Sequence, residues 1–154
     1  MKTISDIQWA YVAGIWDGEG SFSIGRGGRK PNHDHPKGYY NYQLLISLGN
    51  TNVILIDWLV GMLGGAKYLG YRPKTDKHKT GYLWRIHGKE QQRDFICGVL
   101  PYLLLKKEQA LLALQTLDIE GKNPEVRQDL WLKMKSLNRK GKTVETNTPN
   151  TLPE

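Results

Sequence analysis

The sequence is poor in cysteine and in long apolar runs, and it has fewer acidic than basic residues. It contains a single cysteine in 154 residues, so a disulfide framework is excluded and an intracellular, reducing compartment is expected. Cys97 lies in the apolar run FICGVL, which predicts a buried thiol rather than a nucleophile. The longest apolar stretches, near 53–63 and 99–105, are too short to cross a bilayer, and the first six residues lack the pattern of a signal peptide. No membrane partner is expected.

The shortage of acidic residues gives a net charge of +7, from 22 Lys and Arg against 15 Asp and Glu. Most of this excess lies in residues 67–89, where seven basic residues stand against Asp76, a net +6. Tyrosines and a tryptophan lie between these cations. Such a segment can neutralise the phosphates of a nucleic acid, and a solvated surface hairpin is the alternative.

The stretch SDIQWAYVAGIWDGEG, residues 5–20, organises the rest of the chain. Ser5 and Gln8 form a capping-box pair, and the glycines at its end favour termination, so a helix is predicted here. Small residues recur every four positions and leave one helical face nearly bare: Ala10, Gly14 and Gly18. Because the sequence holds no second copy of this stretch, helix pairing through that face requires a second subunit related by a twofold axis.

Two acidic residues, Asp17 and Glu19, lie at the C-terminal end of this helix, where the helix dipole disfavours negative charge. Glu19 is expected just past the helix end, so a twofold dimer would bring two copies of its carboxylate together. These carboxylates repel unless cations lie between them, and oxygen ligands favour magnesium. Such a site suits phosphodiester hydrolysis. Asp17 is interpreted as a brace of the helix end, and a surface helix with two solvated acids is the alternative.

Downstream patterns predict strands over 21–26 and 40–48, separated by a basic loop, and a hairpin over 67–89. Helices are expected over 53–63, 90–100, from Pro101 onward, and 124–137, followed by a polar tail. The helix from Pro101 is expected to place these residues in the core: Leu103, Leu104, Ala110, Leu111, Leu114 and Leu117. The order predicts an α+β domain with one four-stranded antiparallel sheet and helices on one face, αββαββα plus a C-terminal helix. Residues 1–120 form its core and 121–154 the last helix and tail.

The two long strands alternate apolar residues with polar, mostly uncharged ones. Amide side chains on the outward face can pair with adenine in a major groove, and an ordinary hydrated sheet face is the alternative. The residues predicted to contact nucleic acid are Ser21, Ser23, Arg26, Arg29, Lys30, Asn41, Gln43, Ser47, Lys67, Arg72, Lys74, Arg85 and His87. The tryptophans expected to pack in the core are Trp9, Trp16, Trp58 and Trp131.

Residues 12–22, VAGIWDGEGSF, resemble the LAGLIDADG motif of homing endonucleases, with Glu19 in place of the second acid. A single motif indicates the homodimeric branch. The resemblance implies a saddle-shaped sheet over DNA and cleavage of both strands of a long, pseudo-palindromic target. It implies Mg²⁺ or Mn²⁺ at Glu19 and the Gly18 carbonyl, with Ca²⁺ binding but not supporting cleavage. The implied dimer contact involves Ala10, Gly14, Asp17 and Gly18.

The same resemblance adds two residues to the catalytic site. Asn50 matches a Gln or Asn that orients water near the metal, with Asn52 as the alternative. Lys106 matches a lysine that polarises water or stabilises charge near the scissile phosphate, with Lys107 as the alternative. The competing functions are an intron maturase that binds intron RNA and a DNA-binding protein of the same fold without catalysis. An intron-encoded protein of the cytoplasm, nucleoid or an organelle is expected.

Overall fold

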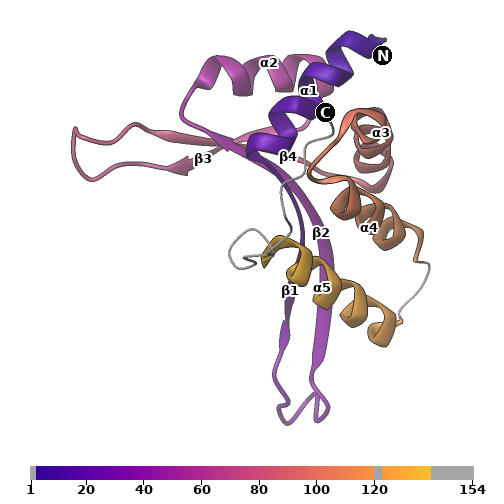
Figure 1. The fold of residues 1–154 in the computed structure, drawn as a ribbon. Helices are drawn as coiled ribbons and strands as arrows, with labels where there is room; N and C mark the ends of the chain where they lie inside the picture. Colours follow the sequence, from indigo (N-terminus) through magenta and orange to yellow (C-terminus); the bar gives the residue numbers. More distant parts are fainter. Residues whose placement is uncertain (1–2, 120–122, 140–154) are drawn as a thin grey trace, which may run out of the picture.

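The computed structural model describes residues 3–119 and 123–139, which form the predicted α+β arrangement (Figure 1). Its four strands make one antiparallel sheet in the order β1-β2-β4-β3. No helix of the described residues is long and apolar enough to cross a membrane. The elements are α1 (Asp6–Glu19), β1 (Gly20–Arg29), β2 (Tyr39–Asn50), α2 (Val53–Leu63), β3 (Ala66–Tyr71), β4 (Gly81–Ile86), α3 (Lys89–Val99), the 3-10 turn η1 (Leu100–Tyr102), α4 (Lys107–Asp118) and α5 (Pro124–Arg139). The predicted αββαββα order is therefore confirmed.

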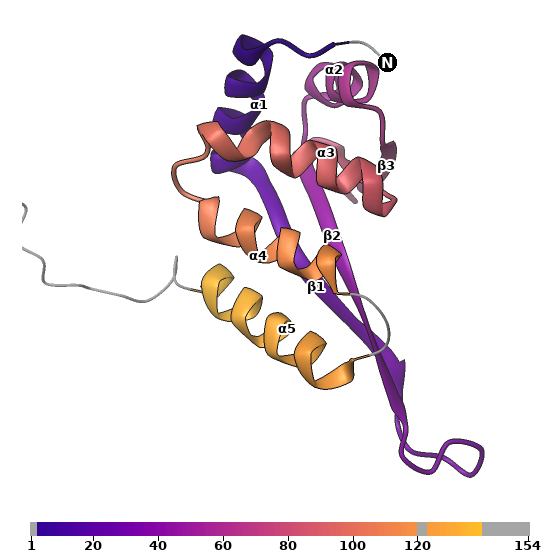
Figure 2. The same cartoon turned by 90° about the vertical axis from the view of Figure 1, so that its right-hand side faces the viewer.

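The β1–β2 hairpin is longer than its apolar alternation predicts. Pairing continues to Arg29 opposite Tyr39, so the connecting loop spans only 30–38. Backbone hydrogen bonds sustain this outer part, where side chains are exposed and no apolar pattern is required. The hairpin extends well beyond the helices (Figure 2). On its other side β2 pairs with β4 only from Ile46 to Asn50, so residues 39–45 form an edge among the described strands.

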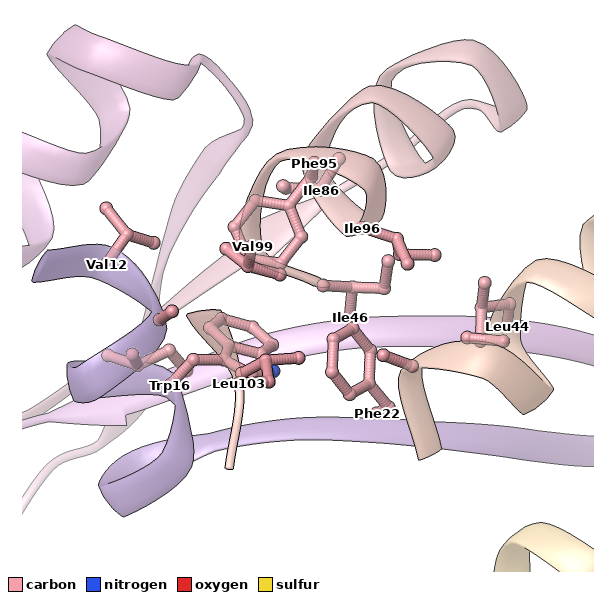
Figure 3. Packing of buried hydrophobic residues seen from close by; sticks show 14 of the residues in the cluster. Val12, Trp16, Phe22, Leu44, Ile46, Ile86, Phe95, Ile96, Val99 and Leu103 are labelled. Carbon is pink, nitrogen blue, oxygen red and sulfur yellow. The ribbon is translucent and has the colours of Figure 1, made fainter. Parts of the chain in front are cut away.

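The core lies between one face of the sheet and the helices (Figure 3). The predicted inward residues of both long strands are buried there: Phe22, Ile24, Leu44, Ile46 and Leu48. Trp16 of α1 is fully buried and contacts Phe22 and Phe95, with ring centroids 5.3 and 4.8 Å apart. A Cβ at Gly20 would lie 2.1 Å from the Trp16 ring, so this ring requires glycine where α1 turns into β1.

A buried glutamine joins α3 to the sheet at the point where β2 and β4 diverge. Gln92 is 8% exposed, and its Nε2 donates to the carbonyls of Leu44 and Ile86 at 3.2 and 3.1 Å. Because unpaired buried carbonyls are costly, this side chain completes the hydrogen bonding where the ladder ends. Gln92 thereby links α3 to both β2 and β4.

Several predictions for the helices are wrong. Cys97 is exposed, because α3 turns Phe95, Ile96 and Val99 toward the core and leaves Cys97 on its outer side. Pro101 lies in the 3-10 turn η1, and α4 begins only at Lys107. The later start changes which residues face inward.

Three of the residues predicted for the core are buried: Leu103, Ala110 and Leu117. Leu104 and Leu111 are instead exposed, and Leu112 and Ala113 are buried. Trp58 is 36% exposed and forms an edge contact with the exposed Tyr11. The final helix matches its prediction more closely, with Leu130 and Met134 buried against the sheet. The predicted polar tail lies outside the described residues.

Candidate functional site

Glu19 and Asn50 meet where α1 ends and β2 ends. Glu19 is the last residue of α1 rather than the first beyond it, and its side chain is exposed. The Asn50 amide donates from Nδ2 to Glu19 Oε2, while its Oδ1 accepts from the Asn52 backbone N–H at 2.7 Å. Asn52 instead uses its side chain to cap α2, accepting from the Ile54 N–H at 3.0 Å. The amide of Asn50 is thus oriented at both ends and holds one carboxylate oxygen of Glu19.

The Glu19–Asn50 pair lies at the rim of two open cavities. One, of about 520 Å³, is bounded by the pair and by β-strand residues that include Gly49 and Leu83. The other, of about 450 Å³, is bounded by the pair and by residues of α1 and α2 that include Gly14 and Gly18. Gly49 and Leu83 are paired neighbours on the sheet face opposite the core. The carboxylate is therefore accessible both from the outer face of the sheet and from the bare face of α1.

Asp17 binds a different segment of the chain. Its carboxylate accepts three backbone N–H bonds, from Leu104 at 2.8 Å, Leu105 at 3.1 Å and Lys106 at 3.0 Å. These residues connect η1 to α4, and Lys106 is the N-cap residue of α4. Asp17 thus braces the segment that carries Lys106, an interaction made entirely within one chain.

Lys106 returns to the end of α1. Its Nζ donates to the carbonyl of Trp16 at 2.9 Å and to that of Gly20 at 2.5 Å. Burial lowers the pKa of Lys106 below the usual value of 10.5, and the nearby charge of Asp17 opposes that shift. A cation at a helix C-terminus is favourable because carbonyls there lack partners. The neighbouring Lys107 is exposed and lies in the first turn of α4.

The bare face of α1 is exposed along its length. No atom lies within 4 Å of a Cβ built at Gly14 or Gly18, and Ala10 is exposed as well. Large apolar side chains flank these small residues in solvent: Ile7 is 83% exposed, Leu104 87% and Leu105 75%. An apolar patch of this kind, on a helix whose other side is fully packed, is typical of a protein interface.

The sheet face opposite the core, here called the open face, carries most of the residues predicted to contact nucleic acid. Strand pairing aligns Ser21, Ser47 and Arg85 across three strands. The Arg85 Nε is buried without a hydrogen-bond partner, and its guanidinium lies 5.8 Å from the Tyr68 ring. By the alternation of the strands, the other predicted residues on this face are Ser23, Arg29, Asn41 and Gln43. His87 contacts the Tyr68 hydroxyl at 2.9 Å, and Lys30, Arg72 and Lys74 lie in the exposed hairpin loops.

Two of the residues predicted to contact nucleic acid lie on the helix side of the sheet. Arg26 shares the helix side of β1 with Phe22 and Ile24, and its guanidinium stacks 4.1 Å from the Trp131 ring of α5. Lys67 lies opposite the buried Trp84 and forms an ion pair with Asp57 of α2 at 2.5 Å. The sum of charges along a hairpin does not show this, because it ignores the alternation of side chains in β3 and the position of α5. Both cations therefore belong to the helix side.

The structure also adds a cation that the predicted contacts omitted. Lys79, in the β3–β4 loop, borders the same cavity as Glu19 and Asn50, together with Tyr71 and Tyr82. Nothing in the sequence distinguishes Lys79 from the other lysines of this loop. Only the tertiary structure shows that Lys79 borders the cavity.

The described residues of one chain contain no group of three or more His, Cys, Asp or Glu side chains able to hold a metal ion. Glu19 supplies one carboxylate, Gly18 precedes it with a backbone carbonyl, and Asn50 is the nearest amide. These are oxygen donors, the type that Mg²⁺ and Ca²⁺ prefer.

Neither a protein-family model nor a curated protein sequence matches the chain. Solved structures do match over nearly its whole length. The homing endonuclease I-CvuI, in complex with the I-CreI target in the presence of Mg, has a TM-score of 0.66 and 20% identity, covering 92% of this chain and 86% of that one. The homing endonuclease I-TnaI has a TM-score of 0.59 and 17% identity, covering 97% and 92%.

A third similar structure, I-SmaMI bound to uncleaved DNA in the presence of calcium ions, has a TM-score of 0.61 and 20% identity. The match covers 99% of this chain and 52% of I-SmaMI, so this chain spans about half of that protein. The chain has the fold of the LAGLIDADG homing endonucleases.

Proposed function

We propose that this chain is a site-specific DNA endonuclease of the LAGLIDADG family, which acts as a homodimer and cleaves both strands of a long, pseudo-palindromic target. The observation that carries the proposal is the position of Glu19, whose carboxylate is accessible from the open face and from the bare face of α1. The similar structures of I-CvuI and I-SmaMI contain DNA targets, which supports DNA as the substrate.

The proposed dimer forms through the bare face of α1. Pairing of two copies about a twofold axis would cover Ala10, Gly14 and Gly18 and the apolar side chains beside them. The axis would then pass beside the C-terminal ends of both helices, which brings Glu19 and the partner's Glu19 together. Two open faces would form one continuous surface that carries the basic residues of both chains.

Divalent metal fits this arrangement. Glu19, the partner's Glu19 and the Gly18 carbonyls would hold it, since Glu19 is the one carboxylate among the described residues that border the two cavities. When bound, the cation would neutralise charge on the attacking and leaving oxygens of the phosphodiester. Two acidic side chains at one axis would otherwise repel each other, so the same cation would stabilise the dimer.

The chain's own residues then have separate tasks. Asn50 holds Glu19 Oε2 through its amide and leaves the other carboxylate oxygen available. Lys106 fixes the end of α1 by donating to the carbonyls on either side of the acidic pair. Lys79 is placed to bind a phosphate oxygen in the cavity on the open face. Arg85 and the polar residues aligned with it would contact base edges or phosphates.

The test is cleavage of a randomised duplex DNA library by the wild type and by Glu19→Gln, each with Mg²⁺ and with EDTA. Glu90→Gln, an exposed carboxylate in the first turn of α3, is the matched control. We expect the wild type and the control to cut a near-palindromic site only with Mg²⁺. Glu19→Gln should bind the same site with a rate of cleavage lower by roughly 10²-fold or more.

Binding of one DNA site by the wild type without cleavage under any metal would contradict the proposed activity and indicate a DNA-binding protein of the same fold. Cleavage by Glu19→Gln at the wild-type rate would show that Glu19 is not part of the catalytic site. Cleavage with EDTA present would show that no divalent metal is needed.

A further inference from the structure

A cavity of about 760 Å³ lies between the free edge of β2 and the first turn of α5. It is larger than either cavity beside Glu19 and shares no wall residue with them. Its volume falls in the range of about 300–1,000 Å³ that is typical of ligand sites. Nothing in the proposed cleavage reaction uses it.

Tyrosine rings form one wall of this cavity. Tyr40 is 54% exposed, and Tyr42, on the same face of β2, is half-buried. Tyr39 also borders the cavity but alternates with them and belongs to the other face of the strand. The Arg26 guanidinium lies 4.7 Å from the Tyr40 ring and 4.1 Å from that of Trp131, so it ties Tyr40 to α5. Exposed aromatic rings held in this way form platforms on which nucleic-acid bases stack.

The remaining walls suit an anion. Lys37 and Arg127 border the cavity together with His35, and none of the described wall residues is a carboxylate. The N-terminal end of α5, at Pro124, also faces it, and helix N-termini favour negative charge. The amide of Gln128, on the α5 wall, can both donate and accept hydrogen bonds at a base edge.

The position of the cavity separates it from the open face. Tyr40 and Tyr42 alternate with the outward residues of β2 and share the side of the buried Leu44. The α5 wall likewise belongs to the helix side of the sheet (Figure 2). A duplex on the open face would not fill this space. In a duplex, moreover, base faces are stacked on one another, so tyrosine rings can stack only on unpaired bases.

We propose that this cavity binds a single-stranded segment of nucleic acid. An unpaired base stacks on Tyr40 while Lys37 neutralises an adjoining phosphate. RNA and single-stranded DNA share this chemistry, and the experiment distinguishes them. The inference does not depend on the endonuclease activity, because binding here involves neither Glu19 nor a metal.

The experiment measures fluorescence anisotropy of labelled oligouridylate and oligothymidylate with the full chain in EDTA, so that cleavage cannot interfere. We expect Tyr40→Leu and Lys37→Gln each to weaken binding roughly tenfold, as loss of one stacking or phosphate contact does. Arg85→Gln, on the open face, is the matched control and should leave this binding unchanged while weakening the binding of duplex DNA. Tighter binding of the ribose oligomer would identify RNA as the preferred ligand, and the reverse would identify single-stranded DNA.

A second measurement locates the site directly. Photocrosslinking of a thio-substituted oligomer to the wild type, followed by peptide mapping, should label residues 39–42 or 124–128. Crosslinks confined to β3 and β4, or binding that falls only with Arg85→Gln, would overturn the proposal. Failure of the folded wild type to bind either oligomer would also overturn it, and circular dichroism of each variant checks that its fold is retained.

Discussion

At the scale of single residues, the two acids of the motif have opposite surroundings. Asp17 accepts three backbone N–H bonds from the segment that leads into α4, whereas Glu19 is exposed and has one side-chain partner, Asn50, among the described residues. A carboxylate saturated with donors is poorly available to an external cation. These hydrogen bonds indicate that Asp17 stabilises the fold, whereas Glu19 is available for the proposed site.

Asp17→Asn should destabilise the protein. An amide can keep an oxygen toward the Leu105 and Lys106 N–H groups, but its NH₂ group would then face the Leu104 donor. We expect a loss of about 1–3 kcal/mol in the free energy of unfolding, measured by urea denaturation.

The matched control for this change is Asp118→Asn, which removes an exposed ion pair with Arg93. Exposed pairs contribute less than about 1 kcal/mol, so this variant should lie close to the wild type. Equal losses in the two variants would show that the bonds of Asp17 to the 104–106 segment contribute no more than a surface pair.

At the scale of elements, α1 has two faces with different functions. Val12, Ala13 and Trp16 are buried against the sheet and α3. On the opposite face, no atom of the described residues outside the helix's own backbone lies within 4 Å of a Cβ built at Gly14 or Gly18. Contact with a second copy would remove the exposed apolar stripe of α1 from water, which is favourable. The proposed dimer contact therefore lies on this helix rather than on the hairpins.

Gly14→Val should therefore leave the monomer folded and weaken association. No atom lies within 4 Å of a Cβ at Gly14, so the added side chain is accommodated within one chain. Between closely paired helices, the same side chain should cost about 1–3 kcal/mol. That corresponds to roughly 10- to 100-fold weaker dimerisation, measured by sedimentation equilibrium.

Gly61→Val is the matched control for this prediction. Gly61 also lies in a helix, α2, with no atom within 4 Å of a built Cβ, so the same change in helix propensity applies. Its dimerisation should equal that of the wild type. A wild type that stays monomeric at all concentrations and on DNA would contradict the homodimer itself.

At the scale of the whole molecule, the charge of the β3–β4 region is divided between two sides. Arg85 lies in the centre of the open face, beside Ser47 and Ala66. Lys67, from the paired strand, points to the helix side and binds Asp57. Net charge along the sequence therefore overstates how much positive charge the open face offers to DNA.

Arg85→Gln and Lys67→Gln remove the same charge from opposite sides of the sheet. We expect the Arg85 variant to bind duplex DNA roughly 10- to 100-fold more weakly, as loss of one good base or phosphate contact does. The Lys67 variant should bind nearly as well as the wild type. Affinity is measured by anisotropy over a range of salt concentrations, and a similar loss in both variants would show that DNA does not contact the open face selectively.

The local pattern of the sequence was sufficient for most of the elements. The capping box at Ser5 and Gln8 begins α1 where predicted, with both of its hydrogen bonds formed. The caps of α2 are Asn52 and Gly64, as predicted. Alternation correctly assigned the buried residues of β1 and β2. These features depend on neighbours within a few positions, for which sequence and conformation are directly linked.

Contacts between distant segments could not be predicted in this way. The bond from Asn50 to Glu19, the three donors to Asp17 and the return of Lys106 to the end of α1 join residues 31 to 90 positions apart. Only the resemblance to a known motif drew attention to Asn50 and Lys106, and nothing drew attention to Lys79. Which side of the sheet Arg26 and Lys67 occupy was likewise decided by strand register and by α2 and α5.

The sequence by itself thus determined the elements, their order and the acid that the proposed chemistry needs. The tertiary structure decided which polar groups meet around that acid and which cations face outward. The reason is physical: helix caps and strand alternation arise from local backbone geometry, whereas the site is assembled by packing of α1, both hairpins and α4 around one core.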